Sequence, residues 1–200
     1  MNVGVLASGA GTNLQAILDR VHGREGIRVV AVASDKPGAK ALARAARAGV
    51  ATGEFPLEAG RAERDAAIAD FLSERGAELV VLAGYMALLT PGFLARFPGR
   101  VINVHPALLP AFPGLHAVEQ ALEYGVKVFG VTVHFVDEGV DTGPIIAQRA
   151  IELPGAPSAA EVREALRPIE HDLLCEAVAL IARGAVTPDP DQPRRVMVRR

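Results

Sequence analysis

Residues 1–21 read MNVGVLASGAGTNLQAILDRV, and the order of segments within them indicates the class of fold. An apolar run over residues 1–7 leads directly into a glycine-rich turn. From Leu14 to Val21 the apolar residues then recur at the spacing of a helix. A buried strand that enters a helix through a glycine turn is the opening unit of a parallel α/β sheet.

The segments as far as His105 repeat this alternation of apolar runs and helical patterns. Near-continuous apolar strands are typical of a parallel sheet that is covered by helices on both faces. The sequence therefore predicts an α/β fold with a Rossmann-like, mostly parallel sheet. Further strands are expected over residues 27–33, 50–55, 78–83 and 101–105, and helices over residues 39–48, residues 62–74 and a short segment that ends near Phe97.

The pattern changes after about residue 126. VKVFGVTVHFVDE and PIIAQRAIELP are long β-like runs separated by GVDTG, which is typical of an antiparallel hairpin that closes the sheet. Residues 158–183 have the pattern of a long terminal helix, with Ser158 and Glu161 as a capping box. Pro168 lies inside this helix and predicts a break or a kink there. Residues 185–200 are expected to form a linker and a basic tail.

The composition excludes several classes of protein. Half of the 200 residues are apolar but only 4% are aromatic, so the core must be aliphatic. A net charge of −2 without an internal basic block argues against nucleic acid as a partner. The single Cys175 excludes an intrachain disulfide and is compatible with a reducing compartment. No apolar run approaches the roughly 20 residues of a membrane span, and the first residues do not read as a signal peptide, so we expect a soluble, cytoplasmic protein.

The glycine turn, Ser8 to Asn13, lies where backbone N–H groups and a helix dipole can receive a phosphate. It fails the dinucleotide fingerprint, because Leu14 stands where the third glycine is needed, although Asp35 could mimic the ribose-binding acid. A plain tight turn is the alternative. We interpret the loop as a monophosphate cradle to which Thr12 and Asn13 add side-chain donors.

The stretch RVINVHPALLPAFPGLH, residues 100–116, places Asn103 and His105 two residues apart at the end of a strand. That spacing puts both side chains on one face, and the prolines that follow stiffen the next loop. An amide donor beside an imidazole suits the stabilisation of an oxyanion and the movement of a proton. The alternative is that both residues only cap the strand.

Asp137, Glu138 and Asp141 lie in the turn VDEGVDTG. A solvated hairpin turn is one interpretation, and a calcium loop is another, although the spacing lacks the EF-hand pattern. In the third interpretation Asp141 turns back toward His105, where a carboxylate would orient the imidazole and favour its protonated form.

Other polar residues give weaker signals. His134 reads as a packed or hydrogen-bonded strand residue, and His116 as a cap of the helix that begins at Ala117 or as part of the site. Cys175 lies on an apolar helix face and reads as a core thiol, not as a nucleophile. No Cys/His cluster has the spacing of a zinc site, so no catalytic metal is expected.

Four separated motifs, SGAGTNLQAI, VLAGYM, NVHPALLPAFPGLH and GVTVHFVDEGVDTGPIIAQ, together resemble the phosphoribosylglycinamide formyltransferase family. The resemblance runs in order from Met1 to about Gly184. It implies a folate-dependent enzyme of purine synthesis that passes a formyl group from 10-formyltetrahydrofolate to the primary amine of glycinamide ribonucleotide, without a metal. It further implies one formyltransferase domain over residues 1–184, with a phosphate-binding half, residues 1–99, and a folate-binding and catalytic half, residues 100–184.

The resemblance also implies roles for individual residues. Asn103, His105 and Asp141 would be the catalytic group. Glycinamide ribonucleotide would be bound through its phosphate and ribose by Gly11, Thr12, Asn13 and Glu170. The folate would contact Arg61, Met86, Ala87, Leu88, Leu89, Asn103, Asp137, Glu138, Gly139, Val140 and Asp141. Family members often carry a basic residue at the position of Ala87 and polar residues at those of Ala107 and Ala111, so the resemblance implies weaker substrate or folate contacts at these three positions.

Several alternatives stay open at this point. Methionyl-tRNA formyltransferase and formyltetrahydrofolate hydrolase share the Asn-x-His loop, but each is expected to carry an additional domain for which 200 residues leave no room. A non-catalytic nucleotide sensor would explain the glycine loop alone, and an NAD-dependent oxidoreductase would need the missing third glycine. The expected partners are the two small substrates, with no nucleic acid or membrane, and the chain is expected to be a monomer or a homodimer.

Overall fold

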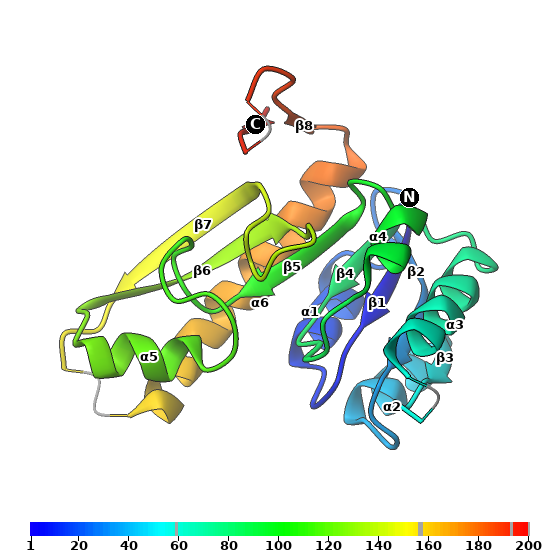
Figure 1. The fold of residues 1–200 in the computed structure, drawn as a ribbon, viewed down its shortest axis with the longest axis horizontal. Coiled ribbons are helices and arrows are strands. Elements are labelled where there is room, and N and C mark those ends of the chain that lie inside the picture. The colour runs from blue at the N-terminus through cyan, green and yellow to red at the C-terminus, as the bar shows by residue number, and fades with distance from the viewer. Residues whose placement is uncertain (59, 156–157, 193, 200) are drawn as a thin grey trace. The chain divides into compact units, whose positions relative to one another are not determined.

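The computed structural model describes residues 1–58, 60–155, 158–192 and 194–199. The chain forms two compact units, Met1–Asn103 and Val104–Arg200 (Figure 1). In the described part of the chain, no helix is both long enough and apolar enough to cross a membrane.

The first unit alternates strands and helices along the chain. Its strands pair in parallel in the order β3-β2-β1-β4-β5, and every predicted segment is present with bounds that differ by at most two residues. The elements are β1 (Asn2–Leu6), α1 (Thr12–Arg20), β2 (Arg28–Ser34), α2 (Lys40–Arg47), β3 (Ala51–Glu54), α3 (Arg61–Ser73), β4 (Leu79–Leu82), α4 (Pro91–Arg96) and β5 (Val101–His105), whose last two residues open the second unit.

The core of the first unit is aliphatic, as the composition predicts. The central strands β1 and β4 are buried along almost their whole length, because each lies between two other strands. From α1, Leu14 and Ile17 are completely buried, and Ile68 and Leu72 of α3 are buried too. Burial of one such side chain stabilises the folded state by about 1.5–3 kcal/mol, so these positions fix the register of helices on strands.

The second unit contains a long antiparallel hairpin, β6 (Val128–Phe135) and β7 (Ile145–Glu152). Helix α6 (Ala159–Ala182) packs against both strands, and α5 (Ala117–Tyr124) packs against α6 (Figure 1). The hydrogen-bonded strand order is β3-β2-β1-β4-β5-β6-β7, with only the last pair antiparallel among the pairs described. The predicted α/β class, with a mostly parallel sheet, an antiparallel hairpin and a long terminal helix, is confirmed.

The long helix begins as the capping box predicts. Glu161 N donates to Ser158 Oγ at 3.3 Å, and the Ser158 hydroxyl donates to Glu161 Oε2 at 2.9 Å. Helix α6 then continues through Pro168 without interruption, so the predicted break is wrong, while a kink stays a prediction. A proline removes one backbone donor, and packing of the helix on two strands outweighs that loss.

The predicted linker and basic tail are only partly correct. Residues after Gly184 form a small antiparallel hairpin of β8 (Val186–Pro188) and β9 (Val196–Val198). Val196 and Val198 alternate in β9, and Val186 and Thr187 give β8 its β propensity. Asp189 Oδ1 accepts a hydrogen bond from Asp191 N at 3.0 Å, so this part of the Pro- and Asp-rich segment forms a turn between the two strands.

Candidate active site

The glycine loop between β1 and α1 is shaped by Gly11. Its φ of 71° lies in the left-handed region, and a Cβ atom there would lie 2.7 Å from Ala41 Cα. Only glycine fits both conditions. Gly11 is also the N-cap residue of α1, and no side chain caps this helix end. An uncapped first turn is the arrangement with which helix termini bind anions, and the phosphate cradle at α1 stays a prediction.

Helix α2 braces the same loop. Ala41 N donates to the Gly9 carbonyl at 3.1 Å, and Arg44 Nε donates to the Ala10 carbonyl at 2.8 Å. Arg44 Nη1 also donates to Gln15 Oε1 at 3.0 Å. These contacts hold the loop backbone in place and bring one positive charge close to it, both of which favour an anionic ligand.

Asp35 is bound inside the first unit. Its Oδ1 accepts a hydrogen bond from Ser8 Oγ at 2.5 Å, and only 8% of the residue is exposed. A ribose-binding acid must offer its carboxylate to a ligand. The hypothesis that Asp35 serves a dinucleotide therefore loses its support.

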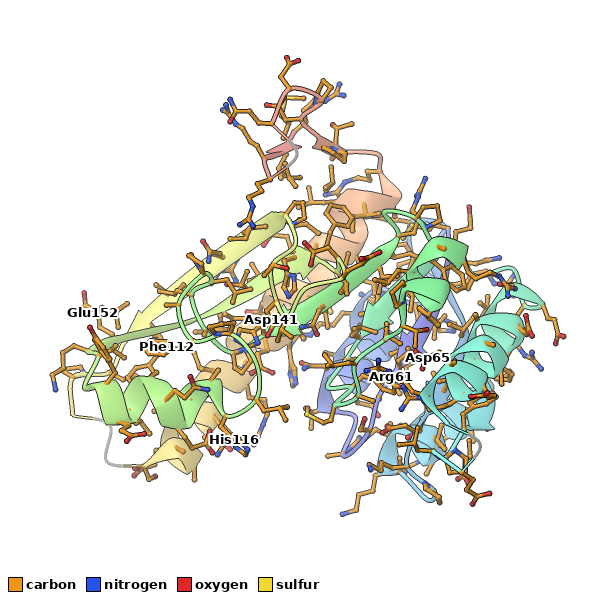
Figure 2. All side chains as sticks on the ribbon, viewed as in Figure 1. Arg61, Asp65, Phe112, His116, Asp141 and Glu152 are labelled. Atoms are coloured by element: carbon orange, nitrogen blue, oxygen red, sulfur yellow. The ribbon has the colours of Figure 1, made fainter. Side chains whose placement is uncertain are left out.

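The segment Met86–Leu89 lies between β4 and α4. Met86 and Leu88 are 60% and 57% exposed. The backbone of the segment is nevertheless anchored, because Ser8 Oγ accepts a hydrogen bond from Met86 N at 2.9 Å. Arg61, the first residue of α3, is exposed (Figure 2). The predicted folate residues of the first unit thus include exposed apolar side chains on an anchored backbone.

At the end of β5, Asn103 is half-buried and His105 is buried. The structure brings Asp141 to His105, because His105 Nδ1 lies 3.3 Å from Asp141 Oδ2. The other ring nitrogen, Nε2, is 2.8 Å from the carbonyl oxygen of Phe112 in the proline-rich loop. Both contacts hold the imidazole in one orientation.

Asp141 has a second histidine neighbour that the sequence interpretation missed. His134 Nε2 lies 3.5 Å from Asp141 Oδ1, and His134 Nδ1 is 2.7 Å from the Phe135 carbonyl oxygen. The prediction of a packed, hydrogen-bonded strand residue is confirmed, since His134 is buried, but its contact with the carboxylate was not foreseen. Thr132 and His134, two polar residues two positions apart in the apolar strand FGVTVHF, were the available signal.

The backbone helps to aim the Asp141 carboxylate. Asp141 has a left-handed φ of 52°, a conformation that aspartate tolerates better than most residues. Gly114 N donates to Asp141 Oδ2 at 2.7 Å, which ties the carboxylate to the proline-rich loop as well. The carboxylate thus receives contacts from three segments, around residues 105, 114 and 134.

The other acids of the turn behave differently from Asp141. Asp137 Oδ1 accepts hydrogen bonds from Thr142 Oγ1 at 2.6 Å and from Gly139 N at 3.1 Å. Asp137 therefore builds the turn, as the hairpin interpretation predicts. Glu138 and Val140 are exposed, and their contact with folate stays a prediction.

Three further residues that the sequence analysis singled out lie on helices α5 and α6 of the second unit. Glu170 is half-buried in the middle of α6. His116 is the N-cap residue of α5, as one of its two interpretations predicts, in a left-handed conformation and without a capping hydrogen bond from its side chain (Figure 2). Cys175 is a buried free thiol, which confirms the prediction of a core residue.

Comparisons with known proteins agree with this geometry. Residues 1–178 match the family described as Formyl transferase. A phosphoribosylglycinamide formyltransferase of Mycobacterium tuberculosis is 45% identical over 184 residues, which are 92% of this chain and 86% of that protein. The protein of the same name from Bacillus subtilis is 42% identical over 170 residues, 84% of this chain and 87% of the relative.

Among solved structures, glycinamide ribonucleotide transformylase 1 from Symbiobacterium toebii matches with a TM-score of 0.94 and 47% sequence identity, covering 99% of this chain and 93% of that one. The chain belongs to the phosphoribosylglycinamide formyltransferase family. The hypotheses of a non-catalytic nucleotide sensor and of an NAD-dependent oxidoreductase are therefore wrong.

In this formyltransferase the charge of Asp141 is strongly favoured. Burial by itself raises the pKa of its carboxyl group, but hydrogen bonds from His134 and Gly114 N and the charges of His105 and His134 outweigh burial and lower the pKa to about 2. Asp141 is consequently ionised at neutral pH.

Each nitrogen of the His105 ring in the formyltransferase lies next to an acceptor. The Phe112 carbonyl and the ionised Asp141 carboxylate can accept but cannot donate a hydrogen bond. The two acceptors hold the ring in one orientation, with a carboxylate on one side and a backbone carbonyl on the other.

Proposed function

We propose that this formyltransferase transfers a formyl group from 10-formyltetrahydrofolate to the primary amine of glycinamide ribonucleotide, giving formylglycinamide ribonucleotide in purine synthesis. The observation that carries the proposal is the pair of the half-buried Asp141 with the buried His105, which lies at the end of β5, two residues along the strand from the amide of Asn103. Similarity to phosphoribosylglycinamide formyltransferases over nearly the whole chain supports the choice of substrates.

The reaction starts when the amine nitrogen attacks the formyl carbon and the carbonyl electrons move to oxygen. The resulting tetrahedral intermediate carries an oxyanion, to which the Asn103 amide and the His105 imidazolium can donate. Each such preorganised donor lowers the barrier by a few kcal/mol in a water-excluded site. Collapse of the intermediate breaks the bond to N10 of the folate.

A proton must also move during the transfer. The attacking amine loses a proton as the new C–N bond forms, and N10 gains one as it leaves. His105, paired with Asp141, is the group that we assign to this transfer. Because the amine is itself the nucleophile, no serine or cysteine nucleophile is required, in agreement with the burial of Cys175.

We assign the binding roles as the family resemblance implies. Gly11, Thr12 and Asn13 bind the phosphate of glycinamide ribonucleotide, which the uncapped first turn of α1 supports, and Glu170 binds its ribose. We assign folate binding to Arg61 and to the segment Met86–Leu89, whose Met86 and Leu88 side chains are exposed, and, as the resemblance implies, to the turn Asp137–Asp141. We also propose that these two small molecules are the partners and that the reaction takes place in the cytoplasm.

A direct assay tests this proposal. The protein is mixed with glycinamide ribonucleotide and 10-formyltetrahydrofolate, and the formylated product is measured by mass spectrometry. Initiator methionyl-tRNA and water replace the amine substrate in parallel reactions, which test the two rival formyl-group activities. Formylation of the ribonucleotide alone supports the proposal, whereas preference for methionyl-tRNA or hydrolysis of the donor contradicts it. The His105→Ala variant is the control for non-enzymatic transfer.

A further inference from the structure

Arg64 and Asp65, adjacent residues on α3, form an ion pair that is buried inside the first unit. Arg64 Nε and Nη2 lie 2.9 Å and 2.6 Å from Asp65 Oδ1, and the two side chains are 3% and 0% exposed. Burial of two charges costs desolvation free energy. Their mutual attraction offsets this cost only when further hydrogen bonds satisfy the remaining donors of the guanidinium and acceptors of the carboxylate. The other partners of this pair therefore indicate its role.

Those partners are backbone atoms of the segment between β4 and α4. Arg64 Nη2 donates to the Leu88 carbonyl at 3.2 Å, and Thr90 N donates to Asp65 Oδ2 at 2.6 Å. The guanidinium carbon also lies 6.0 Å from the centroid of the Tyr85 ring at the start of the segment. The pair thus holds two backbone groups of this segment, the Leu88 carbonyl and the Thr90 N–H, against one face of α3.

The segment is fixed at its other end by Ser8, whose hydroxyl oxygen accepts from Met86 N at 2.9 Å. Between these anchors, the side chains of Met86 and Leu88 stay exposed although they are large and apolar. An anchored backbone that presents exposed apolar side chains is a preformed binding surface, because a ligand can cover it without first ordering a loop.

The geometry of α3 connects this surface with Arg61. Arg61, Arg64 and Asp65 are spaced i, i+3 and i+4, so they lie on one face of the helix. Figure 2 labels Arg61 and Asp65 on α3. One helix face therefore both carries Arg61 and holds the segment Met86–Leu89. Rotation or melting of this face would disturb both groups of residues together.

We propose that Arg64 and Asp65 are positioning residues, which hold the segment Met86–Leu89 in the conformation that binds the folate donor. The pair does not touch the reacting atoms. The proposal rests on the proposed function, because the ligand of the segment is the folate substrate of that reaction.

The double variant Arg64→Met/Asp65→Leu separates positioning from stability. It removes both charges together and replaces them with apolar groups of similar size, a change that is often neutral or stabilising for the fold. It also removes the partners of the Leu88 carbonyl and of Thr90 N. We expect the melting temperature to stay close to that of the wild type, while the KM for 10-formyltetrahydrofolate and the calorimetric Kd for tetrahydrofolate rise about tenfold.

The KM for glycinamide ribonucleotide is the internal reference of this experiment. We expect it to change less than about twofold, since the pair contacts neither the glycine loop nor α1 in the described structure. Unchanged folate binding in the folded double variant would overturn the proposal, and so would an equal rise in both KM values. Should the double variant fail to fold, Asp65→Asn is measured in the same way, with a smaller rise of the folate KM expected and the same results overturning the proposal.

Asp70→Asn provides a matched control on the same helix. Asp70 Oδ1 also pairs with an arginine, Arg96 Nη1 at 2.9 Å, but both side chains are exposed. Exposed pairs contribute little, so folate binding and melting temperature should stay at wild-type values. Failure of the wild type to form product would refute the proposed function, whereas normal turnover with unchanged tetrahydrofolate binding in the double variant would refute only the positioning role.

Discussion

The glycine loop of the first unit and the imidazole–carboxylate cluster of the second unit are built in opposite ways. The loop is shaped by the backbone of one short stretch, opened by the left-handed Gly11. The cluster of His105, His134 and Asp141 brings together ionisable side chains from three separate positions, two of them buried and one half-buried. The glycine loop depends on a positive φ angle and on free volume next to Gly11, so an added side chain should distort it. The cluster depends on the pairing of its charged groups, so loss of one charge should impair it.

The largest expected effect is loss of the charge in the cluster. Asp141→Asn keeps the shape of the side chain but removes the anion that lies beside the His105 ring, so kcat should fall about 10³-fold. Both KM values should change much less, because the interaction matters most in the transition state. Steady-state kinetics with both substrates measure this.

A double variant sharpens the same test. His105→Ala should lower kcat to a similar extent, and the double variant His105→Ala/Asp141→Asn should be little worse than either single variant, because the two residues act as a unit. A folded Asp141→Asn protein with a kcat near that of the wild type would show that the cluster has no catalytic role.

The second effect concerns conformation in the glycine loop. Gly11→Val places a branched side chain at a positive φ and against Ala41 Cα, so the free energy of unfolding should fall by about 3 kcal/mol. Gly9→Ala is the matched control, because a Cβ atom at Gly9 has no neighbour within 4 Å. Urea unfolding curves of both variants measure the difference. Equal losses at the two glycines would contradict the view that space and φ at Gly11 shape the loop.

The third effect is the pH dependence that the cluster adds and the loop does not. The folded-state pKa of Asp141, about 2, lies below its unfolded value near 3.9, so the unfolded state takes up the proton first as pH falls. Asp141 therefore contributes about 2 kcal/mol of stability above roughly pH 4, which is lost as pH falls toward 2.

This dependence is measured by urea unfolding of the wild type and of Asp141→Asn at several pH values. The difference in unfolding free energy between the two proteins should be largest above about pH 5 and should shrink toward pH 2. A difference that does not depend on pH would show that Asp141 gains no net stabilisation from its charge.

The smallest effect concerns a buried polar atom that lacks the pairing seen in the cluster. The Tyr85 hydroxyl is buried and has no hydrogen-bond partner in the described part of the chain, and burial raises the pKa of this group. Tyr85→Phe removes the unsatisfied hydroxyl and keeps the ring, so stability should stay equal or rise by up to about 1 kcal/mol. Thermal unfolding measures this, and a clear loss of stability would show that the hydroxyl is satisfied in solution.

Much of the fold was predictable because its signals are local. Apolar runs, helical spacing and the Ser158–Glu161 cap each follow from neighbouring residues, and the structure bears them out. The tail hairpin was missed, because its valines are separated by a Pro- and Asp-rich turn that reads as a linker. The continuity of α6 through Pro168 was missed for a related reason, since packing on β6 and β7 outweighs the local preference of one proline.

The sequence by itself determined the α/β class, the glycine loop and the pairing of Asn103 with His105 on one strand, because backbone geometry converts short spacings directly into shared faces. Only the tertiary structure decided that Asp141 lies between His105 and His134, that Arg44 braces the glycine loop, and that Arg64 and Asp65 hold the segment Met86–Leu89. These contacts join residues far apart in the chain or depend on which side chains are buried. Their distances and pKa shifts exist only after packing has excluded water and brought the segments together.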